Sequence, residues 1–460
     1  MSNPATPNLH KAGKPNLHGV GTANSPPAKG EYPEGGRGFL PKLRFSEFRD
    51  EGEWANVPID ALLSVRNERL APTDKLPLYS LTIEDGITPK SARYSRDFLV
   101  ADPGKKKYKL VEPQDIVFNP SNLRWGAISH SRLSHAVVVS PIYEVLYVKD
   151  RSATCFDFVA RALMRPEQIA RFIEKGQGTL VERIAVKIEF FVETILPIPM
   201  NWQEQQKISD CLNSLDDLIA AEGRKLEALR RHKQGLMQQL FPQPGETVPR
   251  LRFPEFKNTT EWEFQKLGQM TSKVGSGITP RGGEKNYRSS GRTFIRSQNV
   301  GWGELILDKV VYIDEEIHAS FIATEVREND VLLNISGASI GRSSVADSRI
   351  DGGNVNQHVC IIRSEARQIS ARFLNQYLIS DCGQNQIDNY QAGGNRQGLN
   401  FGQIRSFLIP KPRTVVEQTR IANCLDTLDD IIAAKSRKLE TLRQHKQGLM
   451  QQLFPSVEHH

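Results

Sequence analysis

Residues 224–242 read "RKLEALRRHKQGLMQQLFP", and residues 437–455 read "RKLETLRQHKQGLMQQLFP". Extended toward the N-terminus, the two copies cover residues 209–242 and 422–455, where 25 of 34 positions are identical without a gap. Agreement of this length within one chain indicates an internal duplication. The sequence between the copies has diverged almost completely, so the repeated and the variable regions need separate explanations.

A second pair of matching segments marks the start of each repeat. "LPKLRFSEF" begins at residue 40 and "VPRLRFPEF" at residue 248, and each is followed by a Glu-Trp pair at the same spacing. An Ile-Pro pair precedes each basic segment, at 198–199 and 409–410, an offset of 211. The chain is therefore predicted to consist of two tandem units, about 40–247 and 248–455.

Between Gln203 and Phe241 there is no proline, and apolar residues recur at alternating steps of four and three, the heptad pattern of a coiled-coil seam,. Two self-complementary seams in one chain most simply bury each other. We therefore predict two long antiparallel helices that form a coiled coil and are related by a pseudo-twofold axis. The predicted seam comprises Ile208, Leu212, Leu215, Ile219, Leu226, Leu229, Leu236 and Leu240, and Ile421, Leu425, Leu428, Ile432, Leu439, Leu442, Leu449 and Leu453.

Polar residues and glycines interrupt the seam at equivalent places in both copies. In an antiparallel pair, Glu222 and Lys435 would face each other and fix the register,. The alternative is that both are solvated side chains in a loosened stretch. Gly235 and Gly448 each lower helix stability by roughly 1 kcal/mol relative to Ala, and they suggest either a close backbone approach or a bend,.

The variable bodies mix short β-rich runs with glycine-rich loops and one or two helices, so each is expected to be an α/β (α+β) domain. Within them, "DIVFN" (115–119) and "DVLLN" (330–334) match at an offset of 215, which predicts one fold for both. Residues 1–39 lack apolar periodicity and are expected to be disordered,. The predicted segments are the tail 1–39, body 40–200, helix 201–242, body 243–412, helix 413–455 and the C-terminal tail 456–460.

The overall composition permits a nucleic-acid partner and points to a cytoplasmic protein. The chain has 460 residues, a net charge of +7 and a pI near 9.0,. No apolar run is long enough for a membrane span, and the N-terminus has no signal-peptide core,. The five cysteines lack the spacing of a metal site, so we expect them to be reduced structural thiols,.

Motifs of enzymatic chemistry are missing from the sequence. "NPSN" (119–122) lacks the second proline and the aromatic residue of an amino-methyltransferase motif, and "GASIGRSS" (337–344) lacks the lysine and spacing of a P-loop,. We find no cofactor loop, metal site or nucleophile elbow. The chain is therefore predicted to be non-catalytic.

Loops of the second body are rich in Arg, Asn, Gln, Ser and Gly. Examples are "SGITPRGG" (276–283), "IRSQNV" (295–300), "NISGASIGRSS" (334–344), "NVNQH" (354–358) and "GGNRQGLN" (393–400). Arg pairs with guanine, and Asn or Gln with adenine, through two hydrogen bonds, so this composition suits reading of base edges. In the first body, Lys105 and Lys106 suit phosphates better, because a lysine is a point charge.

Together, the duplicated "HKQGLMQQLFP" helices, the "LRFPEF" segment and the "SGITP", "IRSQNV", "ISGASIGR" and "NQH" loops resemble the specificity subunit of a type I restriction-modification system. The resemblance covers residues 40–455. It implies that each body is a target recognition domain that reads one half of a split sequence in double-stranded DNA. The paired helices would set the gap between the halves and dock two modification subunits.

The resemblance also implies where the chemistry resides. S-adenosylmethionine, ATP and magnesium are expected on the modification and restriction subunits, and this chain is expected to carry no cofactor or metal. A basic face on each helix, nearly identical in the two copies, suits two copies of one partner; a merely solvated face is the alternative. This face comprises Arg224, Lys225, Arg230, His232, Arg437, Lys438, Arg443 and His445.

Candidate DNA-binding residues follow from the loops. In the second body the family pattern places Thr279, Arg281, Arg296, Gln298, Asn299, Ser336, Arg342, Gln357 and Arg396 near DNA. The first body departs from that pattern, and its candidates are Arg93, Arg96, Lys105, Lys106, Asn119, Asn122, Arg124 and Trp125.

Two other functions remain as alternatives. A self-contained DNA methyltransferase would need the cofactor and catalytic motifs that the sequence lacks. A coiled-coil scaffold would use the two bodies to bind proteins, and it would retain no split-site duplex at low salt.

Overall fold

The computed structural model of the protein describes residues 39–90, 107–174, 185–391 and 398–455, so most of the predicted N-terminal tail and the C-terminal tail lie outside the described residues. The chain forms two compact units. One contains the residues up to Ser209 together with those from Gln451 onward, and the other contains Asp210–Met450. The compact units therefore differ from the tandem repeats, because the end of the second repeat packs with the first body.

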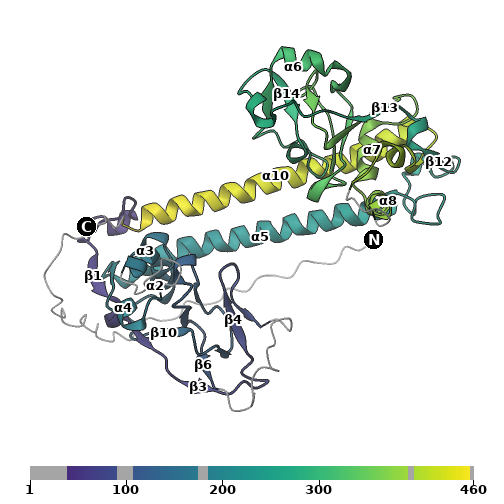
Figure 1. Ribbon diagram of the computed structural model, residues 1–460. Coiled ribbons are helices and arrows are strands. Elements are labelled where there is room, and N and C mark those ends of the chain that lie inside the picture. Colours follow the sequence, from purple (N-terminus) through teal and green to yellow (C-terminus); the bar gives the residue numbers. More distant parts are fainter. Residues whose placement is uncertain (1–38, 91–106, 175–184, 392–397, 456–460) are drawn as a thin grey trace, which may run out of the picture. The chain divides into compact units, whose positions relative to one another are not determined.

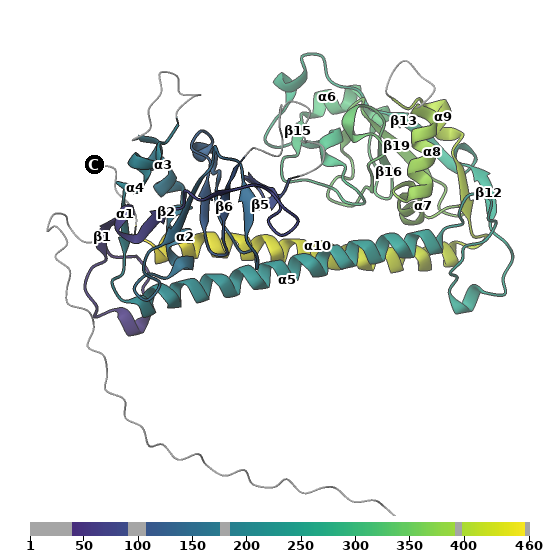
Figure 2. The same cartoon turned by 90° about the horizontal axis from the view of Figure 1, so that it is seen from below.

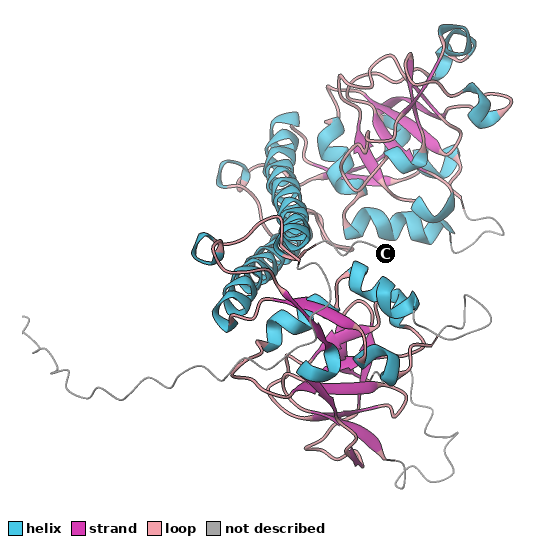
Figure 3. Ribbon diagram, turned by 90° about the vertical axis from the view of Figure 1, so that its left-hand side faces the viewer, coloured by secondary structure: helices cyan, strands magenta, loops and turns pink. Residues whose placement is uncertain are grey.

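The first body is built on short antiparallel strands, with helices beside them (Figures 1 and 3). Its four-stranded sheet has the order β2 (Leu63–Val65), β10 (Glu144–Val148), β7 (Ile116–Phe118) and β8 (Ile128–His130). The other strands are β1 (Ala55–Pro58) paired with β11 (Ile195–Ile198), the sheet of β3 (Arg69–Leu70), β6 (Tyr108–Val111) and β9 (Val137–Val139), and the hairpin of β4 (Tyr79–Thr82) and β5 (Gly86–Pro89). The helices are α1 (Ile59–Leu62), α2 (Phe156–Leu163), α3 (Pro166–Glu174) and α4 (Ile188–Val192).

The second body repeats much of this plan. Its four-stranded sheet has the order β13 (Thr271–Ser276), β19 (Val359–Ser364), β16 (Val331–Asn334) and β17 (Ser343–Val345). The other strands are β12 (Glu263–Lys266) paired with β20 (Leu408–Lys411), and the sheet of β15 (Val311–Ile313), β14 (Arg292–Ile295) and β18 (Asn354–Val355). The helices are α6 (Glu315–Ser320), α7 (Ala371–Leu378), α8 (Asp381–Gln391) and α9 (Phe401–Arg405). Both bodies are thus mixed α and β.

The segments "DIVFN" and "DVLLN", which match at an offset of 215, occupy equivalent places in the two bodies. Each segment forms the third strand of its four-stranded sheet, β7 in the first body and β16 in the second. A residue with positive φ precedes each, Gln114 at 70° and Asn329 at 69°. The next residue, Asp115 or Asp330, is buried and accepts a hydrogen bond from the backbone N–H three positions earlier. The same turn therefore introduces the same strand in both bodies.

The repeated segments form two helices of 39 residues each, α5 (Trp202–Leu240) and α10 (Val415–Leu453). At 1.5 Å per residue each is about 58 Å long. All sixteen predicted seam residues are buried or half-buried, and Leu212 and Leu425 are fully so. Burial of one leucine side chain contributes ~1.5–3 kcal/mol, so the seam supplies the main attraction between the helices.

Ion pairs across the helices establish that they are antiparallel (Figures 1 and 2). Asp216 pairs with Lys446 at 2.5 Å, and Lys233 with Asp429 at 2.6 Å. These two pairs are related by the repeat offset of 213, because residue 216 corresponds to 429 and residue 233 to 446. A pseudo-twofold axis therefore relates the two helices in this region.

At the level of this axis, Glu222 accepts hydrogen bonds from Lys435 at 3.2 Å and from Lys438 at 3.0 Å. The Glu222 side chain is only 5% exposed. Glu222 and Lys435 occupy equivalent positions in the repeat, so the predicted contact across the axis is confirmed and the reading of both as solvated is wrong. A slip of one heptad would separate all three sets of charges, so they select one register of the seam.

The sequence misplaced two details of the repeat. The Ile-Pro pairs are not equivalent, because Ala55 pairs with Ile198 while its counterpart Glu263 pairs with Lys411, which gives an offset of 213. The close backbone approach suggested at Gly235 and Gly448 is not found within the described part of this chain. Among the described residues, a Cβ on either glycine would meet no heavy atom within 4 Å, and both helices continue unbroken.

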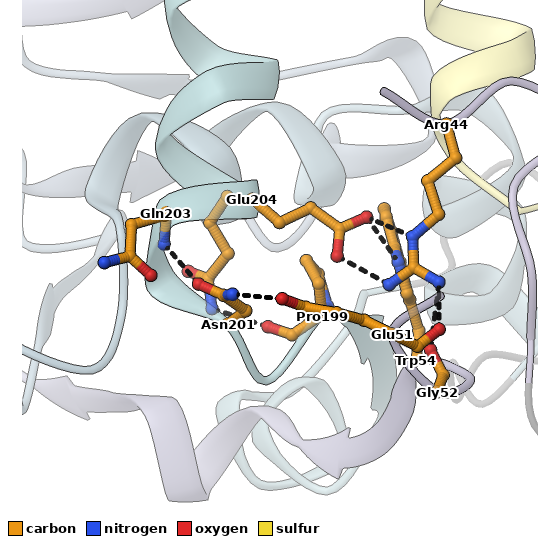
Figure 4. A network of polar contacts seen from close by, with 9 residues as sticks. Arg44, Glu51, Gly52, Trp54, Pro199, Asn201, Gln203 and Glu204 are labelled. Carbon is orange, nitrogen blue, oxygen red and sulfur yellow. Dashed lines mark hydrogen bonds and ion pairs between the residues drawn. The ribbon is translucent and has the colours of Figure 1, made fainter. Parts of the chain in front are cut away.

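The leading "LRF" segment and the Glu-Trp pair bind to the first turn of the following helix. Arg44 forms two hydrogen bonds with Glu204, at 2.8 and 2.7 Å, and Trp54 Nε1 donates to the same carboxylate at 3.2 Å (Figure 4). In the second unit, Arg252 and Trp262 bind Glu417 in the same way. The carboxylates also lie in the first turn, where the helix dipole favours negative charge.

The far end of the other helix completes each core. In the first unit, the Phe454 ring contacts Trp54 and Phe158, with centroids 6.2 and 5.2 Å apart. In the second unit, Phe241 contacts Phe373 and Tyr377, both at 5.5 Å. Each body is therefore bound to the start of one helix and the end of the other.

We expect Glu222→Lys to lower the thermal midpoint of unfolding, because it brings a third positive charge to Lys435 and Lys438 in a buried place. The double variant Glu222→Lys with Lys435→Glu should recover most of the loss. Glu227→Lys is the matched control on the same helix, since Glu227 forms an exposed pair with Arg230 and surface pairs contribute little. Equal losses for Glu222→Lys and Glu227→Lys would contradict the role given to Glu222.

The same contacts predict a pH dependence. Hydrogen bonds from Lys438 and then Lys435 lower the pKa of Glu222 from 4.5 to about 2. Since the pKa is lower in the folded state, ionised Glu222 stabilises the fold above about pH 4.5, and this contribution is lost as the pH falls toward 2. The difference in urea midpoint between the wild type and Glu222→Gln should be constant from pH 8 to 5 and shrink by pH 3. A difference that is unchanged at pH 3 would disprove the assignment.

Candidate nucleic-acid interface

In the second body, the predicted loops meet at one place. The backbone N–H of Gly277, after β13, donates to the carbonyl of Asn356 at 3.2 Å. The N–H of Asn356 in turn donates to Ile295, at the end of β14, at 2.9 Å. A side chain at Gly277 is excluded, because a Cβ there would lie 1.6 Å from the Val355 carbonyl oxygen. Glycine at this position therefore lets two of the loops touch.

The loop between β16 and β17 joins the same group. Ile335 donates its N–H to His358 at 3.0 Å and accepts a backbone hydrogen bond from Leu399 at 2.9 Å. The Asn334 side chain donates to the carbonyl of Ser297 at 2.8 Å. All five predicted loops of this body therefore contact one another through residues that the structure describes, and we name them the recognition loops.

The candidates of the second body differ in exposure. Arg281, Gln298 and Gln357 are exposed, and Thr279, Arg296, Ser336 and Arg342 are half-buried. Arg396 lies outside the described residues. Exposed Arg and Gln side chains have the donors and acceptors that pair with base edges. The group at the surface therefore has the chemistry that direct reading of bases requires.

Two candidates are engaged inside the loops. Asn299 is 1% exposed, and its amide accepts from the Arg296 N–H at 3.0 Å and donates to the Ile306 carbonyl at 2.9 Å. Asn299 therefore shapes its loop, and its expected place at DNA is corrected. The Arg296 guanidinium donates to Lys309 at 3.1 Å and lies 5.2 Å from the ring centre of Tyr287, so its direction is fixed by its own domain.

One residue beside these candidates was missed by the sequence analysis. His358 follows the exposed Gln357, and its Nδ1 lies 2.5 Å from the Ser336 hydroxyl. The other ring nitrogen, Nε2, lies 3.4 Å from the Gln357 amide nitrogen. His358 therefore links the two loops that carry Ser336 and Gln357. The "NQH" motif contained it, but composition alone favoured only the glutamine.

In the first body, half of the candidates are described. Arg93, Arg96, Lys105 and Lys106 lie outside the described residues, whereas Asn119, Asn122, Arg124 and Trp125 form the loop between β7 and β8. This loop is the counterpart of the recognition loop between β16 and β17. Each contains a turn of 3-10 helix and then a left-handed glycine, Gly126 at φ 86° and Gly341 at 87°.

The basic face of the helices is exposed at all eight predicted positions. Lys438 also contacts Glu222, and Arg230 pairs with Glu227 at 2.7 Å. Two apolar residues beside this face were not predicted: Leu218 is 41% exposed and Ile431 is 40% exposed. They are equivalent at the repeat offset of 213, so the same apolar and basic surface occurs on both helices.

Metal and membrane sites were searched among the described residues. No group of three or more His, Cys, Asp or Glu there could hold a metal ion. No described helix is both long enough and apolar enough to cross a membrane. The five cysteines are free thiols.

Comparisons with known proteins identify similar chains. Residues 259–444 match the family described as the type I restriction modification DNA specificity domain. The chain is 22% identical over 282 residues to the type I restriction enzyme MjaVIII specificity subunit of Methanocaldococcus jannaschii, a match that covers 60% of this chain and 65% of that relative, less than two thirds of its length.

Two solved structures share the fold. The S subunit of a type I restriction-modification system from M. genitalium has a TM-score of 0.59 at 15% identity, with 91% of this chain and 100% of that chain covered. A chain from a structural study of complex assembly and conformational transition of the type I R-M system has a TM-score of 0.51 at 15% identity, with 88% and 98% covered.

We expect Gln298→Ala and Gln357→Ala to weaken discrimination at single base pairs, each by ~1–3 kcal/mol, without loss of stability. Asn299→Ala should instead lower the free energy of unfolding by ~1–3 kcal/mol, because it removes the hydrogen-bond partner of the Arg296 N–H and of the Ile306 carbonyl,. Competition binding with duplexes changed at one base pair, together with urea unfolding, measures both effects. Wild-type discrimination in both glutamine variants would exclude these side chains as readers.

Proposed function

We propose that this chain supplies the DNA sequence specificity of a type I restriction-modification complex, because residues 259–444 match the specificity-domain family and its relatives are specificity subunits. Each body would bind one half of a split site in double-stranded DNA. The paired helices would set the gap between the halves and dock two modification subunits. Residues 40–200 and 243–412 are the proposed target recognition domains.

The observation that carries this proposal is the convergence of the five recognition loops in the second body. They place exposed Arg281, Gln298 and Gln357 on loops tied together by backbone hydrogen bonds. Loops fixed by each other lose little entropy on binding, and they keep the spacing of their donors and acceptors. Such a surface suits reading of base edges better than general attraction to phosphate.

The repeated helices support the docking of two equal partners. Leu218, Lys225 and His232 are exposed at intervals of seven residues on α5, and Ile431, Lys438 and His445 repeat them on α10. Since a heptad spacing returns to the same helix face, each helix presents one stripe of apolar and basic groups. Gly235 and Gly448 leave open space on the helix surface. Two equal stripes suit two copies of one protein.

We further propose that this chain carries out no catalytic step. S-adenosylmethionine, ATP and magnesium would bind to the modification and restriction subunits. A self-contained methyltransferase would transfer methyl groups as the purified chain with S-adenosylmethionine alone, and a protein scaffold would bind no split-site duplex. The recognition loops favour the specificity subunit over both.

The proposal is tested by exchanging residues 40–200 for the corresponding body of another specificity subunit. Sequencing of methylated adenines in cells that carry the complex displays both half-sites and their gap. We expect one half-site to change, while the other half-site and the gap stay the same. A change in both half-sites would contradict modular reading.

Docking is tested in the same cells. Leu218→Glu combined with Ile431→Glu should abolish co-purification of the modification subunit and genome methylation, because both stripes then carry a buried charge at the contact. Ala220→Glu, which puts the same charge at an exposed position of α5 outside the basic face, is the control and should retain both. Normal co-purification of the double variant would place the docking surface elsewhere.

A further inference from the structure

The loop between β7 and β8 presents an exposed tryptophan on a rigid support. Trp125 is 62% exposed, whereas its neighbour Leu123 is fully buried. The loop closes through hydrogen bonds from the Asn122 N–H to Asn119 at 3.1 Å and from the Gly126 N–H to Leu123 at 2.8 Å. A large apolar ring is thus held in water by a loop that has little freedom to bury it.

The second body has no counterpart of this feature. Trp125 corresponds to Ile340 at the offset of 215, and Ile340 packs against the hydrophobic core of its own body. The equivalent loop thus turns its apolar residue inward in one body and outward in the other. Both loops reach a left-handed glycine, but the turn of 3-10 helix includes Trp125 in the first body and ends before Ile340 in the second.

The surroundings of Trp125 extend the exposed apolar surface and add a positive charge. The Arg124 guanidinium carbon lies 4.6 Å from the centre of the Trp125 ring. Ile83, in the β4–β5 hairpin, is 57% exposed, and its Cγ2 would lie 4.0 Å from a Cβ on Gly126, so it is next to this loop. Protein wedges that part base pairs combine such apolar side chains with cationic neighbours.

Two carboxylates, Glu84 and Asp85, follow Ile83 in the hairpin and are exposed. Carboxylates repel phosphates, but they accept hydrogen bonds from the amino group of cytosine. This side of the surface is therefore better suited to base edges than to the DNA backbone. Contact of this surface with DNA must therefore come from the apolar side chains of Trp125 and Ile83 and not from attraction to phosphate.

We propose that Trp125, with Ile83 beside it, inserts between neighbouring base pairs of the first half-site and unstacks them. This inference rests on the proposed function, because it takes the loop between β7 and β8 as part of the DNA-binding surface. The first half-site would then be recognised partly through the ease with which its sequence unstacks, which favours flexible pyrimidine–purine steps. The second half-site would be read through the recognition loops without such a wedge.

The experiment uses the full chain assembled with its modification subunits. The probe is a duplex of the methylated split site in which 2-aminopurine replaces single bases of the first half-site, one position at a time. In the wild type, 2-aminopurine fluorescence should rise several-fold at one step upon binding. Trp125→Ala should lose this rise and bind about ten-fold or more weakly, as expected for loss of one base-stacking contact.

Two variants make the result specific. Trp125→Phe should keep part of the fluorescence rise, because a smaller aromatic ring can still enter the step. Trp302→Ala removes another exposed tryptophan, 52% exposed in the second body, and should behave as the wild type. Thermal unfolding of Trp125→Ala should match that of the wild type, since the ring is exposed.

The outcomes separate this inference from the proposed function. If the wild-type complex prefers the split site over a scrambled duplex but shows no fluorescence rise at any position, the wedge is disproved and the proposed function stands. The same conclusion follows if Trp125→Ala retains the rise. If the wild-type complex shows no preference for the split site, the proposed function fails and the wedge fails with it.

Discussion

The pairing of α5 with α10 is the constraint on which the rest of the structure depends. The leucine seam supplies attraction, but a heptad seam alone is compatible with several registers. Glu222 between Lys435 and Lys438, with the flanking pairs Asp216–Lys446 and Lys233–Asp429, fits one register. Glu222 and Lys233 are largely buried, and loss of hydration offsets much of the attraction in such pairs, so their main contribution is this selection,. The register in turn fixes which residues of α5 and α10 face outward.

Each body attaches to these helices through a polar contact and an aromatic contact. Glu204 and Glu417, in the first turns, bind the arginine and tryptophan that precede each body. Phe454 and Phe241, just beyond the last turns, fill the cores of the bodies. Because these contacts involve only the frame of each body, the loops can change without loss of attachment. This separation is what a modular recognition protein needs.

Repetition and divergence thus correspond to two kinds of surface. The outer stripes on α5 and α10, with Leu218 and Ile431, are equal and suit equal partners. Equivalent loops of the two bodies differ, since Trp125 is exposed whereas Ile340 packs against the core of its own body. Under the proposed function, one fold would present base-reading side chains in one body and an apolar wedge in the other.

The sequence by itself determined the duplication, the two long helices and the polar loops of the second body, whereas the contact of Glu222 with Lys435 and the meeting of the loops needed the structure. The duplication and the helices follow from repeat offsets and hydrophobic periodicity, which can be measured along the sequence without knowledge of the fold. Only the tertiary structure decided four other features. These are the register of the Ile-Pro segments, the buried amide of Asn299, the link through His358 and the exposed ring of Trp125. Whether a side chain is exposed or packs inside its own domain depends on neighbours that are distant in sequence. A local sequence pattern does not contain this information.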